Sequence, residues 1–223
     1  MSANSTVEDH VASARTARTV TAKSVMLNEN SFWVLYNQHT EPTYIDTGAG
    51  QQVQRDNGLS YVKQWRTAID VGANVGEWTR PLSKKFESVV CFEPNPNFRK
   101  CFAKNITEKN VVLWPYGLSD NEHKAKQDFN STQLQNEDGD IHCRTLDSFR
   151  LTNVDYVKID VDGFEIPVLK GAVWTLQKNS PVINIEMKRR KRPEIVAQAQ
   201  FILQRWGYRF ISRRRSDEIW IKK

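Results

Sequence analysis

A glycine-containing turn between Asp70 and Gly76 has the residue types of a ligand-binding loop. In residues 67–79, TAIDVGANVGEWT, a short apolar run predicts a strand, Gly72 and Gly76 permit a tight turn, and a helix is expected next. A dinucleotide-binding loop needs the glycine spacing G-x-G-x-x-G, whereas this turn has two glycines and an acid at its mouth. S-adenosylmethionine suits it, because the sulfonium and ammonium groups are cationic and the carboxylate can meet free N–H groups at the helix start.

A second acid follows at the distance expected for a ribose contact. Residues 88–92, SVVCF, predict a strand that is closed by Glu93. An acid at this place in an α/β nucleotide fold can accept hydrogen bonds from both ribose hydroxyls. The turn and the acid together predict a nucleoside-type ligand.

Acids or turns close every strand that we expect in the main sheet. These strand ends carry Asp70, Glu93, residues 116–120 (YGLSD), residues 160–163 (DVDG) and Glu186. Ligands of doubly wound sheets lie outside the carboxyl ends of the parallel strands, so we expect a shared pocket. For Asp120 or Asp162 alone, capping of the next helix remains an alternative.

The elements that must position these residues alternate between strands and helices. We predict strands over 68–71, 88–92, 111–118, 141–146, 154–161 and 182–187, helices over 77–86, 97–106, 164–176 and 195–206, and a closing hairpin of 208–211 with 218–221. Residues 119–139 are polar and predict a long loop or exposed hairpin. The order predicts an α/β fold, a doubly wound sheet with a C-terminal antiparallel hairpin.

The length of 223 residues suits one α/β domain with a small extension. We expect residues 1–22 to be a flexible tail, residues 23–66 an N-terminal extension or cap with a hairpin and a helix, and residues 67–223 the main domain. No apolar run approaches the roughly 18 residues of a membrane span. The three cysteines have no metal-type spacing and predict reduced thiols, without zinc or disulfides. These features predict a soluble, cytoplasmic protein.

Several motifs, in order and evenly spaced, resemble the FkbM family of S-adenosylmethionine-dependent methyltransferases. They are DVGANVG (70–76), FEPNP (92–96), GLSD (117–120), RTLD (144–147), KIDVDGFE (158–165) and VLKGA (168–172). The resemblance implies a class I methyltransferase fold, with a seven-stranded sheet whose last strand is antiparallel. It also implies O-methylation of a hydroxyl on a sugar or natural product. The chain departs from the family at Asp162, where Glu is common.

The resemblance further implies roles for single residues. It places Asp70, Gly72, Asn74 and Gly76 around the methionine end of the cofactor, Glu93 with the adjoining Pro94 at the ribose, Gly117, Leu118 and Ser119 near the adenine, and Asp160 at the transferred methyl.

Methyl transfer to a hydroxyl needs a base that removes the hydroxyl proton during attack. The candidates, in order, are Asp160, Asp162 and Glu186. The same carboxylates could bind Mg²⁺ or Ca²⁺, although we predict no metal. His123 and His142 flank the polar segment and are further candidates, but solvent-facing histidines are the simpler interpretation.

The net charge of +6 is concentrated near the C-terminus. From Glu186 onward there are twelve Lys or Arg against four acids, a balance of +8, so the preceding residues sum to −2. The densest run is Lys188, Arg189, Arg190, Lys191 and Arg192. It is either a solvated surface or a contact for an acidic glycan or RNA, with Trp206, Tyr208 and Trp220 as possible stacking partners.

The sequence therefore predicts a methyltransferase that moves a methyl group from S-adenosylmethionine to a hydroxyl. The expected acceptor is a glycan or another small hydroxylated molecule, with acidic groups as an option. Two alternatives are an RNA ribose 2′-O-methyltransferase and a non-catalytic module that only binds S-adenosylmethionine.

Overall fold

The computed structural model describes residues 25–27, 32–35, 49–127, 134–135 and 139–222. The tail predicted over residues 1–22 lies outside the described residues. Part of the predicted N-terminal hairpin is described, because β1 (Val25–Leu27) pairs antiparallel with β2 (Trp33–Leu35). Within the described ranges, no helix is both long and apolar enough to cross a membrane.

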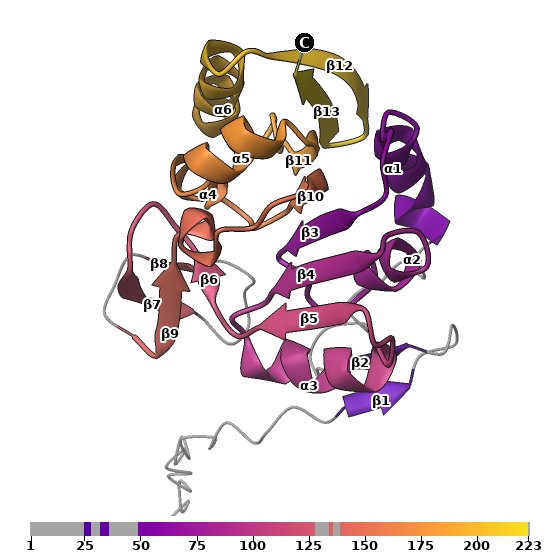
Figure 1. The fold of residues 1–223 in the computed structure, drawn as a ribbon. Coiled ribbons are helices and arrows are strands. Elements are labelled where there is room, and N and C mark those ends of the chain that lie inside the picture. Colours follow the sequence, from indigo (N-terminus) through magenta and orange to yellow (C-terminus); the bar gives the residue numbers. More distant parts are fainter. Residues whose placement is uncertain (1–24, 28–31, 36–48, 128–133, 136–138, 223) are drawn as a thin grey trace, which may run out of the picture.

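The predicted seven-stranded sheet is confirmed (Figure 1). Its spatial order is β5 (Val111–Trp114), β4 (Ser88–Phe92), β3 (Thr67–Val71), β10 (Val154–Ile159), β11 (Val182–Glu186), β13 (Asp217–Lys222) and β12 (Tyr208–Arg214). The first five strands are parallel, and β13 is antiparallel to both of its neighbours. The central strands are nearly continuous apolar runs because helices cover both faces of the sheet.

Within the part of the chain that the structure describes, three helices pack on each face of the sheet. One face carries α1 (Ala49–Leu59), α2 (Thr79–Ser83) and α3 (Pro96–Asn105), and the other carries α4 (Glu165–Lys170), α5 (Val173–Asn179) and α6 (Pro193–Arg205). Leu59, Leu82 and Phe102 bury the first set in one core. Leu169, Leu176 and Leu203 bury the second set in the other core.

Three predicted elements differ from the structure. The strand expected over 111–118 ends at Trp114, because Pro115 has no N–H to donate to a neighbouring strand. The helix expected over 164–176 is divided at Gly171, where a Cβ would lie 1.9 Å from the carbonyl oxygen of Ser119. The helix expected over 77–86 is only the short α2.

The chain beyond Pro115 forms a second, smaller sheet instead. Its order is β6 (Gly117–Leu118), β9 (Ile141–Arg144), β7 (His123–Gln127) and β8 (Leu134–Gln135). The polar segment after Leu118 is therefore partly a hairpin, and 128–133 with 136–138 lie outside the described residues. Because β6 pairs with β9, the chain turns away from the main sheet after the carboxyl end of β5.

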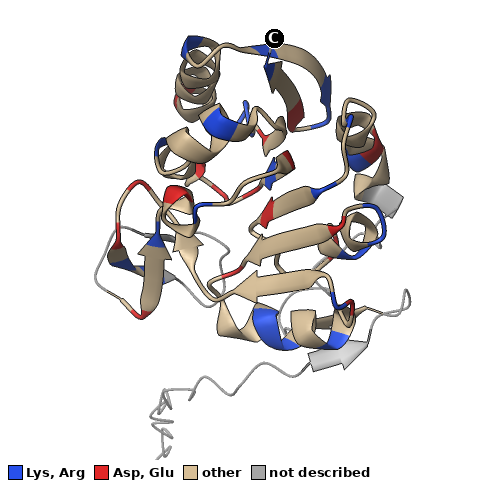
Figure 2. Ribbon diagram, in the orientation of Figure 1, with Lys and Arg blue, Asp and Glu red and all other residues tan. Residues whose placement is uncertain are grey.

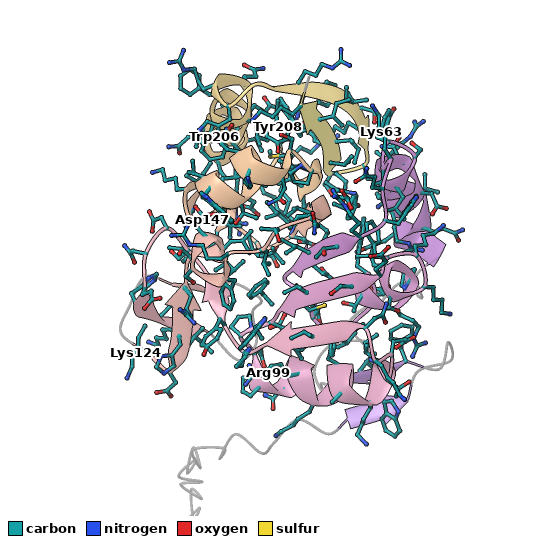
Figure 3. All side chains as sticks on the ribbon, in the orientation of Figure 1. Lys63, Arg99, Lys124, Asp147, Trp206 and Tyr208 are labelled. Carbon is teal, nitrogen blue, oxygen red and sulfur yellow. The ribbon has the colours of Figure 1, made fainter. Side chains whose placement is uncertain are left out.

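Asp147, the last residue of the RTLD motif, holds the start of α5 (Figure 3). Its carboxylate accepts hydrogen bonds from the backbone N–H groups of Trp174 and Thr175, both at 2.8 Å, and from the Thr175 hydroxyl. These donors otherwise have no partner in the first turn of a helix. The motif is thus explained by a structural role away from the ligand.

We expect Asp147→Ala to lower the free energy of unfolding by about 1–3 kcal/mol, because α5 loses its N-terminal acceptor. Urea unfolding followed by circular dichroism measures this change. Glu87→Ala is the matched control, since Glu87 is exposed and its loss should cost less than about 0.5 kcal/mol. Equal midpoints for the two variants would contradict the assignment.

Candidate active site

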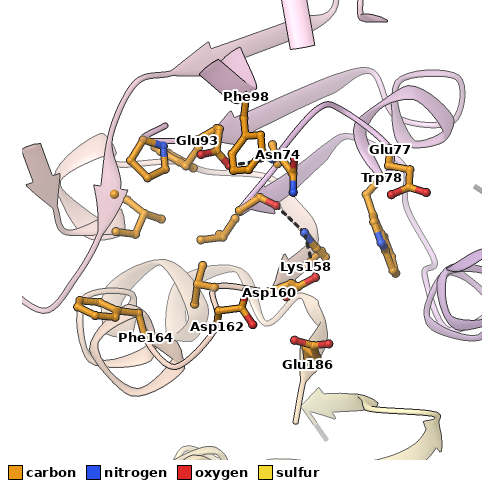
Figure 4. Close-up of a pocket in the computed structure, with 18 of the residues that line it drawn as sticks. Asn74, Glu77, Trp78, Glu93, Phe98, Lys158, Asp160, Asp162, Phe164 and Glu186 are labelled. Atoms are coloured by element: carbon orange, nitrogen blue, oxygen red, sulfur yellow. Dashed lines mark hydrogen bonds and ion pairs between the residues drawn. The ribbon is translucent and has the colours of Figure 1, made fainter. Parts of the chain in front are cut away.

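A cavity of about 260 Å³ lies at the carboxyl ends of the central parallel strands (Figure 4). Its walls come from the segments after β3, β4, β5 and β10, from the end of β11, and from Gln51 of α1. Figure 2 shows acidic and basic residues together at these strand ends. This is the place where doubly wound sheets bind ligands.

Most residues predicted from the sequence line this cavity. They are Gly72, Asn74, Glu93, Pro94, Gly117, Leu118, Asp160, Asp162 and Glu186. Asp70, Gly76 and Ser119 are buried behind the cavity wall and do not line it. His123 and His142 line a separate hollow beside β7 and β9.

Both glycines of the turn are required by close packing. Gly72 has φ +79°, and a Cβ there would lie 2.0 Å from the carbonyl oxygen of Asp160. Gly76 has φ +95°, and a Cβ there would lie 2.6 Å from the side chain of Ile106. The turn can therefore pack closely against the end of β10 on one side and beside α3 on the other.

The carboxylate of Glu93 is fixed by the backbone on both sides. One oxygen accepts the N–H of Asn74 at 2.9 Å, and the other accepts the N–H of Asn95 at 2.8 Å. Burial raises the pKa of Glu93 to about 7, although these two hydrogen bonds act in the opposite direction. A fixed carboxylate with lone pairs to spare is suited to accept hydroxyl donors.

Lys158 is a buried cation that the sequence analysis quoted within a motif but gave no role. Its Nζ lies 3.2 Å from Oδ1 of Asp70 and donates a 2.8 Å hydrogen bond to the carbonyl oxygen of Gly72. The other oxygen of Asp70 accepts the Thr79 hydroxyl at 2.7 Å. Burial acts to lower the pKa of Lys158, but the carboxylates of Asp70 and Asp160 outweigh it and raise the pKa.

This ion pair changes the interpretation of Asp70. The sequence predicts Asp70 at the mouth of the turn, with its negative charge toward a cationic ligand. In the structure the Asp70 side chain has no exposed surface, and Lys158 separates it from the cavity. Asp70 therefore holds Lys158 and the turn in place from beneath. A lysine inside the apolar strand 154–159 was the available signal for this arrangement.

The acids at the ends of β10 and β11 form one charged group with Lys188. Its ammonium lies 2.7 Å from Oε2 of Glu186 and also pairs closely with Asp162. Burial raises the pKa of Glu186 to about 8, with further contributions from the charge of Asp160 and a hydrogen bond to it, while Lys188 opposes the shift. The burial of Glu186 and its closeness to Asp160 therefore favour the protonated form of its carboxyl more than is usual for a glutamate.

The basic run 188–192 is not a continuous solvent-facing patch. Besides Lys188 in the cavity, Arg189 pairs at 2.5 Å with Glu218, whose side chain has no exposed surface. Arg192 is half-buried beside Gly163. Only Arg190 and Lys191 remain exposed without such a contact among the described residues. Most of this charge is used within the fold.

Two of the three aromatic residues proposed to stack on sugars or bases lie in the core. Tyr208 and Trp220 are buried, and the Tyr208 hydroxyl donates to the carbonyl oxygen of Leu176 at 3.1 Å. Trp206 is partly buried and packs against the same core (Figure 3). The structure corrects the stacking hypothesis for Tyr208 and Trp220.

The donors and acceptors of the cavity fit S-adenosylmethionine. Oδ1 of Asn74 is buried without a hydrogen-bond partner, so it can accept an ammonium N–H. Glu93 offers a carboxylate for a ribose diol. Apolar side chains that can contact an adenine ring complete the walls, namely Phe92, Phe98, Leu118, Val161 and Phe164.

The strand order and the cavity at the carboxyl ends of the strands define a class I methyltransferase fold. Residues 70–210 match the model of the methyltransferase FkbM domain, which is more than half of the chain. The chain belongs to this family of S-adenosylmethionine-dependent methyltransferases.

The chain is also 30% identical over 127 residues to the hexuronic acid methyltransferase AglP of Haloferax volcanii. That match covers 51% of this chain and 53% of AglP, so the chain spans about half the length of this curated relative.

Two solved methyltransferase structures share the fold. Methyltransferase FkbM of Methylobacillus flagellatus has a TM-score of 0.54 at 20% identity, over 70% of this chain and 43% of that one. The precorrin-6y C5,15-methyltransferase of Geobacter metallireducens has a TM-score of 0.53 at 14% identity, over 82% of this chain and 92% of that one. Identities this low show the fold alone.

We expect Glu93→Ala to abolish binding of S-adenosylhomocysteine in calorimetry, and Glu93→Gln to weaken it. Because two N–H groups already face the carboxylate, ligand hydroxyls favour its ionised form. Wild-type affinity should therefore fall as the pH drops below about 7, the pKa of Glu93 in the ligand-free protein. Glu87→Ala is the exposed control. Unchanged affinity in Glu93→Ala would remove Glu93 from the site.

We expect Lys158→Met to lower the free energy of unfolding by about 3–5 kcal/mol, because it leaves Asp70 buried without its cation. The double variant Lys158→Met with Asp70→Asn should recover much of that loss. Denaturant unfolding measures both. A loss below about 1 kcal/mol in the single variant would show that the pair does not stabilise the fold.

Proposed function

We propose that this protein transfers a methyl group from S-adenosylmethionine to a hydroxyl oxygen of a sugar-like acceptor. The observation that carries the proposal is the position of two carboxyls, Asp160 and Glu186, at one end of the cavity that also contains the glycine turn and Glu93. The similarity to a hexuronic acid methyltransferase supports a sugar as the acceptor class.

In this proposal the chain's residues hold S-adenosylmethionine along the cavity wall. The Glu93 carboxylate accepts hydrogen bonds from the ribose hydroxyls, and Oδ1 of Asn74 accepts one from the ammonium group. Gly117 and Leu118 lie against the adenine. When bound, S-adenosylmethionine supplies an electrophilic methyl group on a positively charged sulfur. Lys158 does not add free positive charge there, because Asp70 and Asp160 compensate it.

Asp160 is the residue that best fits the role of base. Its side chain is 30% exposed and lines the cavity, and the nearest cation among the described residues is Lys158, whose Nζ lies 3.9 Å away. Asp162 and Glu186 are instead both paired with Lys188, and burial raises the pKa of Glu186. The geometry thus favours Asp160 over the two other predicted candidates.

The proposed reaction balances without a further reactant. The acceptor oxygen bonds to the methyl carbon as the carbon–sulfur bond breaks, and the electron pair of that bond stays on sulfur. The hydroxyl proton passes to the Asp160 carboxylate and from there to solvent. The main tasks of the protein are alignment of the acceptor and removal of this proton.

RNA as the acceptor has less support than a sugar. The run 188–192 was its basis, and two of those five cations, Lys188 and Arg189, form ion pairs within the fold. Purified protein offered S-adenosylmethionine with a labelled methyl group, together with neutral glycosides, uronic-acid glycosides or RNA, tests the proposal. Label in a glycoside supports it, label in RNA overturns it, and cofactor binding without transfer indicates a non-catalytic module.

We expect Asp160→Asn to lower kcat by about 10²- to 10⁴-fold, because the hydroxyl proton loses its acceptor. Affinity for S-adenosylhomocysteine should change less than about threefold. Asp140→Asn, at an exposed position, is the control for both measurements. Near-normal turnover in Asp160→Asn would show that another group accepts the proton.

A further inference from the structure

A second cavity of about 220 Å³ adjoins the first one. Its lining residues are Gln51, Gln54, Asp160, Glu186, Arg215, Ser216 and Asp217, all of them polar. Gln51, Asp160 and Glu186 line both cavities, so the two meet at the carboxyls of the proposed reaction centre. A ligand in the second cavity would therefore lie beside Asp160.

Besides its carboxyls, this cavity contains a buried amide, that of Gln54, with an unsatisfied hydrogen-bond acceptor. The residue is only 4% exposed, yet its side-chain oxygen Oε1 has no hydrogen-bond partner. A buried amide oxygen without a partner costs free energy unless a ligand or water satisfies it. Gln51, one turn earlier on α1, receives a hydrogen bond from the indole N–H of Trp78.

The C-terminal hairpin supplies the opposite wall. Asp217 is the register partner of Glu186 in the β11–β13 pair, and the hydroxyl of Ser216 donates to Glu186 at 3.2 Å. The hairpin turn is anchored by a 2.7 Å hydrogen bond from the N–H of Met187 to the carbonyl oxygen of Ser216. Asp217 is therefore held beside the reaction centre by sheet pairing.

The carboxyls of this cavity are less readily ionised than isolated ones. Burial, followed by the charge of Asp160, raises the pKa of Asp217 to about 7. The pKa of Glu186 is raised by the same two causes, and the Arg215 guanidinium supplies a positive charge at the same cavity. Amides and carboxyls of this kind pair with hydroxyl groups and ether oxygens, whereas an apolar or aromatic ligand would leave them unsatisfied.

We infer that this second cavity is the acceptor site, and that Gln54 and Asp217 bind the hydroxyl groups of a sugar ring within it. The inference rests on the proposed function and adds its acceptor-binding residues. The sugar hydroxyls donate to Oε1 of Gln54 and to the Asp217 carboxyl, and the ring so held presents one hydroxyl to Asp160. Neither residue accepts the proton, so both are binding and positioning residues.

The test is steady-state kinetics with a glycoside that the wild-type protein methylates. We expect Gln54→Leu and Asp217→Asn each to raise KM for the glycoside at least tenfold, while the Kd of S-adenosylhomocysteine stays within about threefold. Gln52→Leu and Asp56→Asn are the matched controls, because both residues are exposed on α1 and should leave KM unchanged. Circular dichroism and thermal unfolding establish that each variant folds.

The possible outcomes separate this inference from the function on which it rests. If wild-type protein methylates a glycoside and both variants retain its KM, the second cavity is not the acceptor site although the function stands. If wild-type protein methylates no glycoside, the proposed function fails first. A parallel loss of S-adenosylhomocysteine binding in both variants would overturn the inference by assigning the residues to the cofactor.

Discussion

The ion pair between Lys158 and Asp70 is the constraint on which the rest of the site depends. It joins the two central strands, β10 and β3, and Lys158 also holds the carbonyl oxygen of Gly72 at the start of the turn. A buried charge is tolerated only with such partners, so the position of Lys158 fixes the positions of Asp70 and of the turn. Asp160 then follows two residues after Lys158 and emerges into the cavity.

The two cavities differ in the polarity of their walls. The first combines Glu93 and Asn74 with aromatic and aliphatic walls, which suits a nucleoside. The second is polar throughout and is completed by the C-terminal hairpin. In the proposed function the antiparallel strand β13 is more than an extension of the sheet, because its pairing with β11 sets Asp217 opposite Glu186.

Charged residues near the C-terminus also stabilise the fold through contacts with one another. Glu218 receives hydrogen bonds from Arg189, Gln200 and Trp220, which ties the segment after β11 to α6 and β13. Lys188 balances Asp162 and Glu186. Two cations of the basic run are therefore part of the folded structure, and the net charge of +6 is a poor guide to the acceptor.

The sequence by itself determined the doubly wound sheet, its closing hairpin, and the placement of Gly72, Glu93 and Asp160 at the cavity, because apolar periodicity and strand-end residues are local patterns. Only the tertiary structure decided that Asp70 lies beneath the wall, that Lys158 neutralises it, and that Gln54 and Asp217 meet across a second cavity. These features depend on contacts between segments far apart in the chain. A local pattern, such as a lysine inside an apolar strand, can signal a buried charge, but its partner is decided only when such segments come together.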